Sequence, residues 1–219
     1  MQPHLRNAFD VDAVRKQDAT PVFLIRHGQT QWNRERRFLG RTDIPLDETG
    51  IAQATTLSAR LKQHPITHVY TSPLARARQT ATIVGAPHDL DPRIVEGITE
   101  LDQGHLEGRE GRTLAADFPD FFAAWRRDPT DVRIPGGETL AECHARSVRS
   151  FSAALRHHTP ADTVVVVSHK VAISGIICDL LGLPPRFNMM VEQANTAINL
   201  LAWKAGSASL VRLNDHDHL

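Results

Sequence analysis

Short apolar runs recur along the chain and alternate with segments of helical periodicity. The runs are PVFLIR (21–26), HVYTS (68–72), TVVVVS (163–168), TAINLLAW (196–203) and SLVRL (209–213). Their length and their content of β-branched residues are typical of strands, and helical spacing of apolar positions separates most of them. The alternation predicts a layered α/β sandwich in which the last two strands form an edge hairpin.

The predicted helices carry start signals. Asp47 is the expected N-cap of the helix that follows it, and Ser72, followed directly by proline, is the expected N-cap of the next helix. A helix that starts at residue 112 is interrupted near Pro119, and a long amphipathic helix begins near Gly137. The segment DPTDVRIPGG between these two is predicted to be a loop.

The composition fits one globular domain. The chain has 219 residues, of which 41% are hydrophobic and 23% charged, enough to bury a substantial core. Lys plus Arg and Asp plus Glu each total 25, so no net charge favours nucleic acid or an anionic membrane as a partner. We expect a single domain over residues 20–219, after an N-terminal arm of residues 1–19 that is either mobile or packed on the surface.

Cysteine usage and the N-terminal sequence indicate a cytoplasmic protein. Cys143 and Cys178 lie far apart, and Cys178 falls within an apolar stretch where a buried thiol is expected. No disulfide framework is indicated. The first twenty residues show no signal or anchor pattern, and no apolar run approaches the length of a membrane span.

Two apolar runs end at a histidine, His27 in VFLIRH and His169 in VVVVSH. Ligands of open α/β sheets bind outside the carboxyl ends of the strands, so both histidines are expected at the functional edge. The run HVYTS leads into a helix with Arg76 and Arg78 in its first turns. A phosphate at that helix start would suit the N–H groups and a guanidinium, and Arg78 is expected to face solvent.

These residue types point to phosphoryl chemistry. A neutral imidazole is a competent nucleophile near pH 7, and the adjacent Arg26 helps to keep His27 neutral. The alternative for this stretch is a polar turn that only caps the strand. No zinc pattern of the H-E-x-x-H or Cys-x-x-Cys type occurs, and the terminal DHDHL is expected to be a frayed end. We therefore expect no metal and no cofactor.

Several motifs together resemble the histidine phosphatase superfamily, also called the phosphoglycerate mutase-like family. The residues RHGQTQWN, SPLARARQTA, ELDQGHLEG and VVVSHK are similar to its four principal elements, and GRTDIPLDETGIAQA and PGGET are weaker echoes. They occur in the family order between residues 21 and about 203. The resemblance implies a three-layer α/β/α sandwich with a mostly parallel central sheet.

The resemblance also implies roles for individual residues. His27 is the nucleophile that becomes phosphorylated, and Glu100 is the general acid that protonates the leaving alcohol and then activates water. The remaining residues implied to bind the phosphate and stabilise its charge are Arg26, Arg76, His169, Thr30 and Asn33.

Glu100 has rivals in the same acidic segment. Gly104 and the Glu107-Gly108 pair fall at the family spacing after Glu100, which favours Glu100 as the acid. The alternative for Glu100 is a surface carboxylate in an acidic loop, with Asp102 as the second choice for the acid and Glu96 as a further rival. Glu107 is expected to be structural or to support a neighbouring site residue.

Lys170 departs from the family pattern, because many members have glycine after the second histidine. It either adds positive charge near the substrate, as a further phosphate-binding residue, or faces solvent.

Three functions are open to this catalytic set. If water attacks the phosphohistidine, the protein is a phosphatase. If a hydroxyl group of a second, phosphorylated substrate attacks it, the protein is a cofactor-dependent mutase. Arg76 and Glu100 are only 24 positions apart, too few for the longer insertion of the mutases, which favours hydrolysis. A non-catalytic binding module is disfavoured because no catalytic position is replaced.

The predicted substrate is a small phosphomonoester. The segment of about 105–137 is expected to be a lid-like helical insertion, on which Phe118, Phe121, Phe122 and Trp125 either pack inward or line an apolar pocket. Loop arginines are either surface charge or contacts to a second anionic group of the substrate: Arg37, Arg41, Arg109 and Arg112. The edge hairpin either pairs with a second subunit, forming a homodimer, or faces solvent.

Overall fold

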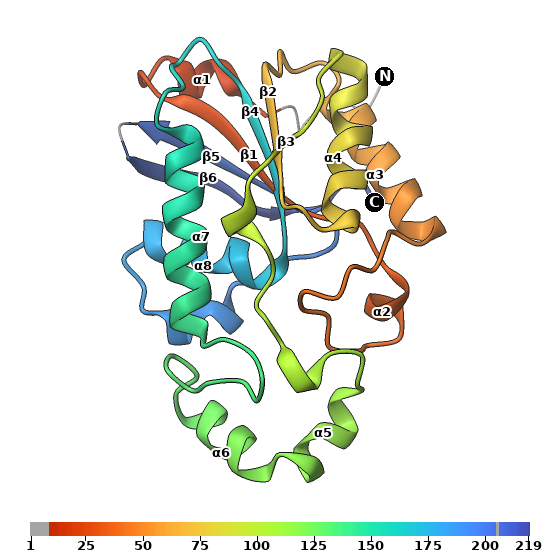
Figure 1. Cartoon of the computed structure of the whole chain (residues 1–219). Coiled ribbons are helices and arrows are strands. Elements are labelled where there is room, and N and C mark those ends of the chain that lie inside the picture. The colour runs from red at the N-terminus through yellow and green to blue at the C-terminus, as the bar shows by residue number, and fades with distance from the viewer. Residues whose placement is uncertain (1–8, 205) are drawn as a thin grey trace.

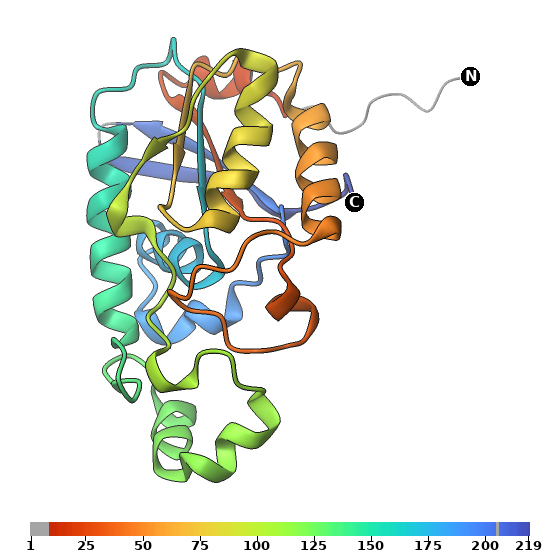
Figure 2. The ribbon, with the colours of Figure 1, turned by 45° about the vertical axis from the view of Figure 1, so that its right-hand side comes forward.

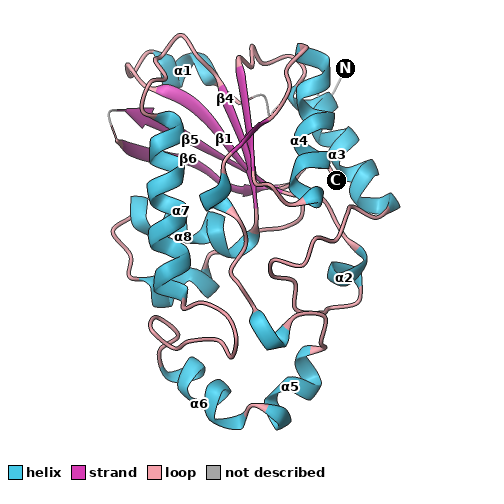
Figure 3. Cartoon of the chain, in the orientation of Figure 1, coloured by secondary structure: helices cyan, strands magenta, loops and turns pink. Residues whose placement is uncertain are grey.

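The computed structural model describes residues 9–204 and 206–219, and within them six strands form one sheet (Figures 1 and 3). The order is β3-β2-β4-β1-β5-β6. β1 is parallel to β4, β4 to β2 and β2 to β3, whereas β5 is antiparallel to both β1 and β6. The strands are β1 (Thr20–Arg26), β2 (His68–Thr71), β3 (Arg93–Ile94), β4 (Val164–Ser168), β5 (Ile198–Lys204) and β6 (Ser207–Asp215). The mostly parallel sheet and the edge hairpin are confirmed.

Helices cover both faces of the sheet, as the uninterrupted apolar sequence of the central strands requires (Figure 2). Phe23 and Ile25 of β1 belong to one core cluster, whereas Val22 and Leu24 belong to a second cluster on the opposite face. The first face is covered by α1 (Val11–Arg15), α3 (Glu48–Leu61) and α4 (Ala75–Gly85), and the second by α7 (Leu140–Leu155) and α8 (Lys170–Leu180). The three-layer α/β/α sandwich is therefore confirmed.

The helix starts agree only in part with the sequence analysis. Asp47 caps α3 by accepting a hydrogen bond from Gly50 N–H at 2.8 Å, as predicted. The predicted cap at Ser72 is wrong, because α4 begins at Ala75, whose N–H donates to Asp43 at 2.6 Å. The hydroxyl of Ser72 instead lies beside a histidine of the site described below.

The helix α7 begins three residues after the predicted start at Gly137. Gly136 adopts a left-handed backbone with φ of 72°, and Gly137 N–H donates to the Ile134 carbonyl at 2.8 Å. These glycines therefore form a turn, and the helix starts at Leu140, directly after its N-cap Thr139, which forms a capping box with Glu142.

Residues 9–19 pack against the sheet. Phe9 is buried and meets the ring of Phe23 edge-on at 5.4 Å, while Val11 and Val14 of α1 join the same core cluster. This part of the predicted N-terminal arm therefore contributes buried residues to the core on that face of the sheet, whereas residues 1–8 lie outside the described chain.

A separate group of helices lies beyond the carboxyl ends of the parallel strands (Figure 1). It contains η3 (Gly104–Leu106), α5 (Gly111–Asp117) and α6 (Pro119–Arg127), and the break before Pro119 is the one predicted. The remaining short elements are α2 (Gln31–Arg34), η1 (Ala86–His88), η2 (Glu96–Ile98) and η4 (Pro185–Met190). Within the described chain, no helix has the length and apolarity needed to cross a membrane.

Candidate active site

The two histidines predicted at the functional edge are neighbours. Arg26 and Ser168 are paired in the parallel register of β1 and β4, so the next residues, His27 and His169, leave the sheet side by side. Their ring centroids are 5.1 Å apart, and both residues are at most 2% exposed. The sheet itself therefore brings together two imidazoles that are far apart in the sequence.

The backbone fixes which nitrogen of His27 carries the proton. Its Nδ1 lies 2.7 Å from the carbonyl oxygen of Gly28, and a carbonyl can only accept, so Nδ1 donates. The lone pair of a neutral His27 is consequently on Nε2. Burial lowers the pKa of His27 well below its usual value, and the charges of Arg76 and Arg26 lower it further. His27 is therefore neutral at pH 7.

His169 is held by Ser72, the residue that follows β2. Its Nε2 lies 2.7 Å from Ser72 Oγ. Burial lowers the pKa of His169 well below its usual value, with Arg76 and the neighbouring His27 adding to the effect. His169 is thus a second neutral ring at the edge.

Arg76 is completely buried and is held by a loop of the backbone. Its Nη2 donates to the Gly40 carbonyl at 2.7 Å and its Nη1 to the Thr42 carbonyl at 3.0 Å. Burial lowers its pKa to about 10, so the guanidinium still carries its charge at pH 7. Glu107 in turn holds the loop, because its carboxylate accepts from Arg41 N–H at 2.7 Å and from Thr42 N–H at 2.8 Å.

Arg26 is anchored through its Nη1. Its Nη1 donates to the Gln193 carbonyl at 2.7 Å, and burial lowers its pKa. Its Nε, the Nε of Arg76 and the Nδ1 of His169 are buried without a hydrogen-bond partner among the described residues. Buried polar atoms are rarely left unpaired. Unpaired atoms on two cations and a histidine are suited to the oxygens of an anion.

Glu100, two residues after η2, is buried against the first turn of α8. Its Oε1 accepts from Leu101 N–H at 2.8 Å, and both its oxygens lie 3.2 Å from Val171 N–H. Burial raises its pKa, against the opposing effect of those two hydrogen bonds and of Arg76 and Arg26. Glu100 is thus a carboxyl group that holds its proton to higher pH than an exposed glutamate, near two cations.

The rivals of Glu100 are engaged elsewhere or exposed. Asp102 accepts from Gly104 N–H at 3.0 Å and lies 3.5 Å from Arg41. Glu96 is exposed, and Glu107 supports the loop around Arg76. Burial therefore separates Glu100 from Asp102, the second choice of the sequence analysis.

Thr30 and Asn33 have their hydrogen bonds in local structure. The Thr30 N–H and Oγ1 both donate to Asn33 Oδ1, at 3.1 and 3.0 Å, in a capping box that starts α2. Lys170, the first residue of α8, pairs with the exposed Glu192 at 3.2 Å. Contacts of these three side chains to a phosphate stay predictions.

Arg146 on α7 was missed by the sequence analysis. It donates to the carbonyls of Gly97, Thr99 and Glu100 at 2.7–2.9 Å, and it pairs with Glu138 at 2.8 Å. It therefore fixes the backbone that carries Glu100. The only sequence signal was Glu138, which belongs to the motif PGGET.

Three loop arginines have acidic or carbonyl partners. Arg37 pairs with Glu35 at 2.6 Å, Arg41 with Glu138 at 2.8 Å, and Arg109 with Asp117. The side chain of Arg112 lies outside what the structure describes. A role for these residues toward a substrate stays a prediction.

An apolar cavity of about 120 Å³ is lined by two residues that contact Glu100 through their backbone. Leu101 and Val171, whose N–H groups donate to Glu100, line it. Three aromatic residues of α6 complete one side of its wall: Phe121, Phe122 and Trp125. Three of the four aromatic residues predicted to pack inward or to line an apolar pocket thus line one.

Fold and site together define a histidine phosphatase type of architecture, in which two strand ends and the helix α4 bring two histidines and two arginines to one edge of an α/β sheet. The sequence model of the histidine phosphatase superfamily, branch 1, matches residues 22–216. The chain therefore belongs to this superfamily.

Curated relatives and solved structures resemble almost the whole chain. "Probable phosphoglycerate mutase GpmB" of Cronobacter sakazakii is 36% identical over 211 residues, which cover 90% of this chain and 94% of the relative. Bacillus stearothermophilus YhfR has a TM-score of 0.84 at 27% identity and covers 91% of this chain and 99% of its own. The alpha-ribazole phosphatase of Shigella flexneri has a TM-score of 0.80 at 28% identity, with 90% and 97% covered. Relatives of this chain thus include proteins named as phosphatases and proteins named as mutases.

Proposed function

We propose that this protein hydrolyses a small phosphomonoester through a phosphohistidine on His27, with Glu100 as general acid and base. The observation that carries the proposal is the state of His27. Its Nδ1–H is engaged by the Gly28 carbonyl and its pKa is lowered, so Nε2 presents a lone pair beside unpaired cationic N–H groups. A turn that merely caps a strand needs none of these features.

In the first step, His27 Nε2 attacks phosphorus and the ester P–O bond breaks. The charge on the transferred group is stabilised by Arg26, Arg76 and His169. The proton of Glu100 goes to the departing oxygen, which leaves as a neutral alcohol.

In the second step, water attacks the phosphohistidine. Glu100, now a carboxylate, takes a proton from the water as its oxygen bonds to phosphorus and the P–N bond breaks. Phosphate leaves, and His27 and Glu100 return to their initial protonation states. We expect turnover without an added metal ion, because the arginines supply the positive charge that a metal supplies in other phosphatases.

The apolar cavity lined by Leu101 and Val171 supports a substrate with an apolar organic part. The leaving oxygen has to lie next to Glu100, and we propose that the group attached to it extends toward the cavity lined by Leu101, Val171 and the aromatic residues of α6. A cavity of about 120 Å³ accommodates a small apolar group.

Mutase activity is the second candidate, favoured by the name of the 36% identical relative. The same phosphohistidine would then pass its phosphoryl group to a second substrate instead of water. The segment between Arg76 and Glu100 contains the rest of α4, the short elements η1 and η2 and the two residues of β3. The shortness of this segment favours hydrolysis.

The deciding experiment is a panel of phosphomonoesters, with phosphate release as the readout. 3-Phosphoglycerate with catalytic bisphosphoglycerate is assayed in parallel for isomerisation. We expect phosphate release, and we expect His27→Ala to abolish it while the circular dichroism spectrum is unchanged. His157→Ala is the control, because His157 is an exposed histidine outside the site.

Each alternative has its own outcome. Isomerisation without phosphate release would identify a mutase, and retained turnover in His27→Ala would remove His27 as nucleophile. Absence of both activities would indicate a binding module.

A further inference from the structure

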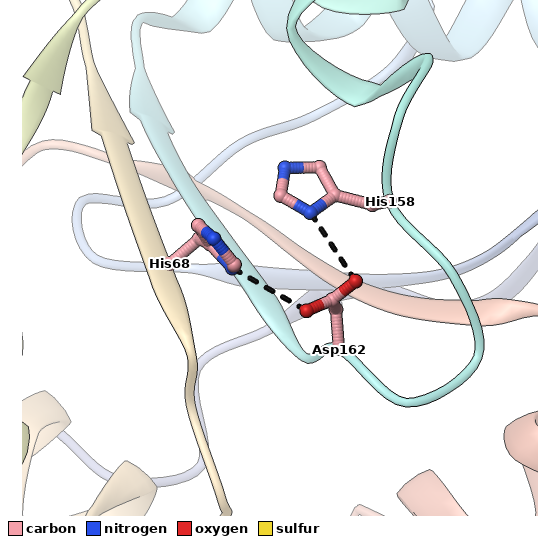
Figure 4. A group of neighbouring side chains, drawn as sticks. All are labelled: His68, His158 and Asp162. Atoms are coloured by element: carbon pink, nitrogen blue, oxygen red, sulfur yellow. Dashed lines mark ion pairs between the residues drawn. The ribbon is translucent and has the colours of Figure 1, made fainter.

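Two histidines and an aspartate converge at the amino end of β2 (Figure 4). His68 is the first residue of β2, His158 follows the end of α7, and Asp162 lies in the loop before β4. One potential ligand atom of each lies within 4.8 Å of the other two. We propose that His68, His158 and Asp162 form a binding site for a divalent cation of the zinc type.

The distances fit a metal site better than a set of hydrogen bonds. Asp162 Oδ1 is 3.6 Å from His68 Nδ1, and Asp162 Oδ2 is 3.5 Å from His158 Nδ1. N–H···O hydrogen bonds span about 2.7–3.2 Å, so both contacts are too long. Ligands bonded tetrahedrally to Zn²⁺ at about 2.0–2.2 Å lie roughly 3.3–3.6 Å from one another. Each imidazole Nδ1 therefore already lies at nearly the separation of two zinc ligands from one oxygen of the carboxylate, and the three ligand atoms lie within 4.8 Å of one another.

A second set of contacts orients two of the three ligands. The Nε2 of His158 lies 2.9 Å from the Tyr70 hydroxyl, so an Nε2–H can donate there and leave the Nδ1 lone pair directed toward Asp162. Asp162 Oδ2 accepts from Thr159 N–H at 2.9 Å and from its hydroxyl at 3.3 Å. Ligating histidines and carboxylates are typically supported by outer hydrogen bonds of this kind.

His68 can be released to a metal without leaving a polar group unsatisfied. Its Nδ1 lies 2.9 Å from the Thr67 hydroxyl. That hydroxyl also lies 3.2 Å from the Thr163 carbonyl, to which it can turn when a cation takes the Nδ1 lone pair. Thr67 thus keeps a hydrogen bond in both states.

The ligand set is chemically selective and open to solvent. Two imidazoles and one carboxylate suit borderline cations such as Zn²⁺, whereas Mg²⁺ and Ca²⁺ prefer oxygen ligands. The side chains are 28%, 8% and 22% exposed for His68, His158 and Asp162, so a cation can enter. Water can fill the fourth position.

The location gives the site a role separate from catalysis. β2 runs from His68 to Thr71 and is followed by Ser72 beside His169, so the strand, at about 3.3 Å per residue, holds the cation and the active site roughly 13 Å apart. A bound cation would join β2, the end of α7 and the loop before β4. It should therefore raise the melting temperature and leave turnover unchanged.

Direct binding of Zn²⁺ to the full chain tests the proposal, measured by calorimetry, with Co²⁺ absorption as a report of tetrahedral geometry. The measurements are made on the His27→Ala protein, which removes the histidine pair of the active site as a competing ligand. We expect one equivalent to bind with the visible bands of tetrahedral Co²⁺. The Tm should rise with Zn²⁺ concentration.

Matched variants test whether the bound cation is held by His68, His158 and Asp162. Asp162→Asn keeps the size of the side chain but weakens its oxygen ligand. Asp162→Asn and His158→Ala, each as a single substitution, should weaken Zn²⁺ binding at least about tenfold. Tyr70→Phe should weaken Zn²⁺ binding by roughly 10–100-fold. His157→Ala, one residue away on an exposed side chain, should bind like the parent. Undiminished binding in Asp162→Asn, or no binding of Zn²⁺ by the parent, would overturn the proposal. Turnover of the wild-type enzyme after chelation tests catalysis separately.

Discussion

At the scale of single residues, the site is organised by where protons are held. The Gly28 carbonyl directs the His27 proton to Nδ1, and burial keeps that ring neutral while it keeps the Glu100 carboxyl protonated to a higher pH. Removal from water thus lowers the pKa of the nucleophile His27 and raises the pKa of the acid Glu100, because burial disfavours the charged form of each group. Both are the protonation states that the proposed first step needs.

Glu100→Gln should discriminate between leaving groups. We expect it to slow turnover of an alkyl phosphate by roughly 10²–10⁴-fold, because the alcohol then leaves without a proton donor. p-Nitrophenyl phosphate should be affected much less in the first step, because nitrophenolate leaves without protonation. Single-turnover rates on both substrates measure the difference, with Asp102→Asn as control. Equal losses on the two substrates would argue against Glu100 as the acid.

At the scale of elements, the charged residues Arg76 and Glu100 are positioned by backbone segments, and these segments are fixed by hydrogen bonds to the side chains of Glu107 and Arg146. Glu107 accepts hydrogen bonds from the backbone N–H groups of Arg41 and Thr42. The carbonyls of Gly40 and Thr42, in the same loop, accept from Arg76. Arg146 does the same for the segment before Glu100. These are positioning residues, whose effect reaches the substrate only through the residue they hold.

Glu107→Gln should loosen the loop around Arg76. The amide has one carbonyl oxygen in place of two carboxylate oxygens, so one backbone N–H loses its acceptor, at a cost of about 1–3 kcal/mol in the free energy of unfolding. We expect kcat/KM to fall by roughly 10–100-fold, mainly through KM, since Arg76 would hold phosphate less well. Urea unfolding and steady-state kinetics measure the two effects. Glu48→Gln, at an exposed acid of α3, is the control, and unchanged kinetics in Glu107→Gln would contradict the positioning role.

At the scale of the whole molecule, burial removes several histidines from water as neutral rings. The pKa of His144 is lowered to about 4 by burial, and those of His27 and His169 are also lowered. The unfolded chain binds protons at these residues near pH 6.5, where the folded protein does not. Folding stability is therefore linked to pH through the core itself.

The free energy of unfolding should decrease as the pH falls below about 6.5. Between the lowered folded pKa values and 6.5 the unfolded state carries more protons, so stability rises with pH in that window. Glu100, with its raised pKa, acts in the opposite sense, but it is one group against several histidines. Urea titrations at several pH values measure the slope. His144→Gln should reduce the slope, and an unchanged slope would exclude His144 as a contributor.

Much of the architecture could be predicted from the sequence, because the relevant signals are local. The apolar runs located β1, β2, β4, β5 and β6, and the motifs marked residues that the structure brings to one edge, including His27, His169 and Arg76. The two-residue strand β3 was missed, since so short a segment has no periodicity. Ser72 was assigned to a helix cap because its neighbour Pro73 is a helix-start signal, whereas the folded chain places its hydroxyl against His169.

The sequence by itself determined the fold class, the superfamily and the residues with the capacity for phosphoryl chemistry, because strand length, helix spacing and motif order are properties of short stretches. The tertiary structure alone decided which carboxylate is buried, which donors remain unpaired, and that Arg146 holds the backbone of Glu100. It also brought His68 together with His158 and Asp162, which are more than 80 positions further along the chain. Burial and convergence depend on how distant segments pack, and no local pattern encodes them.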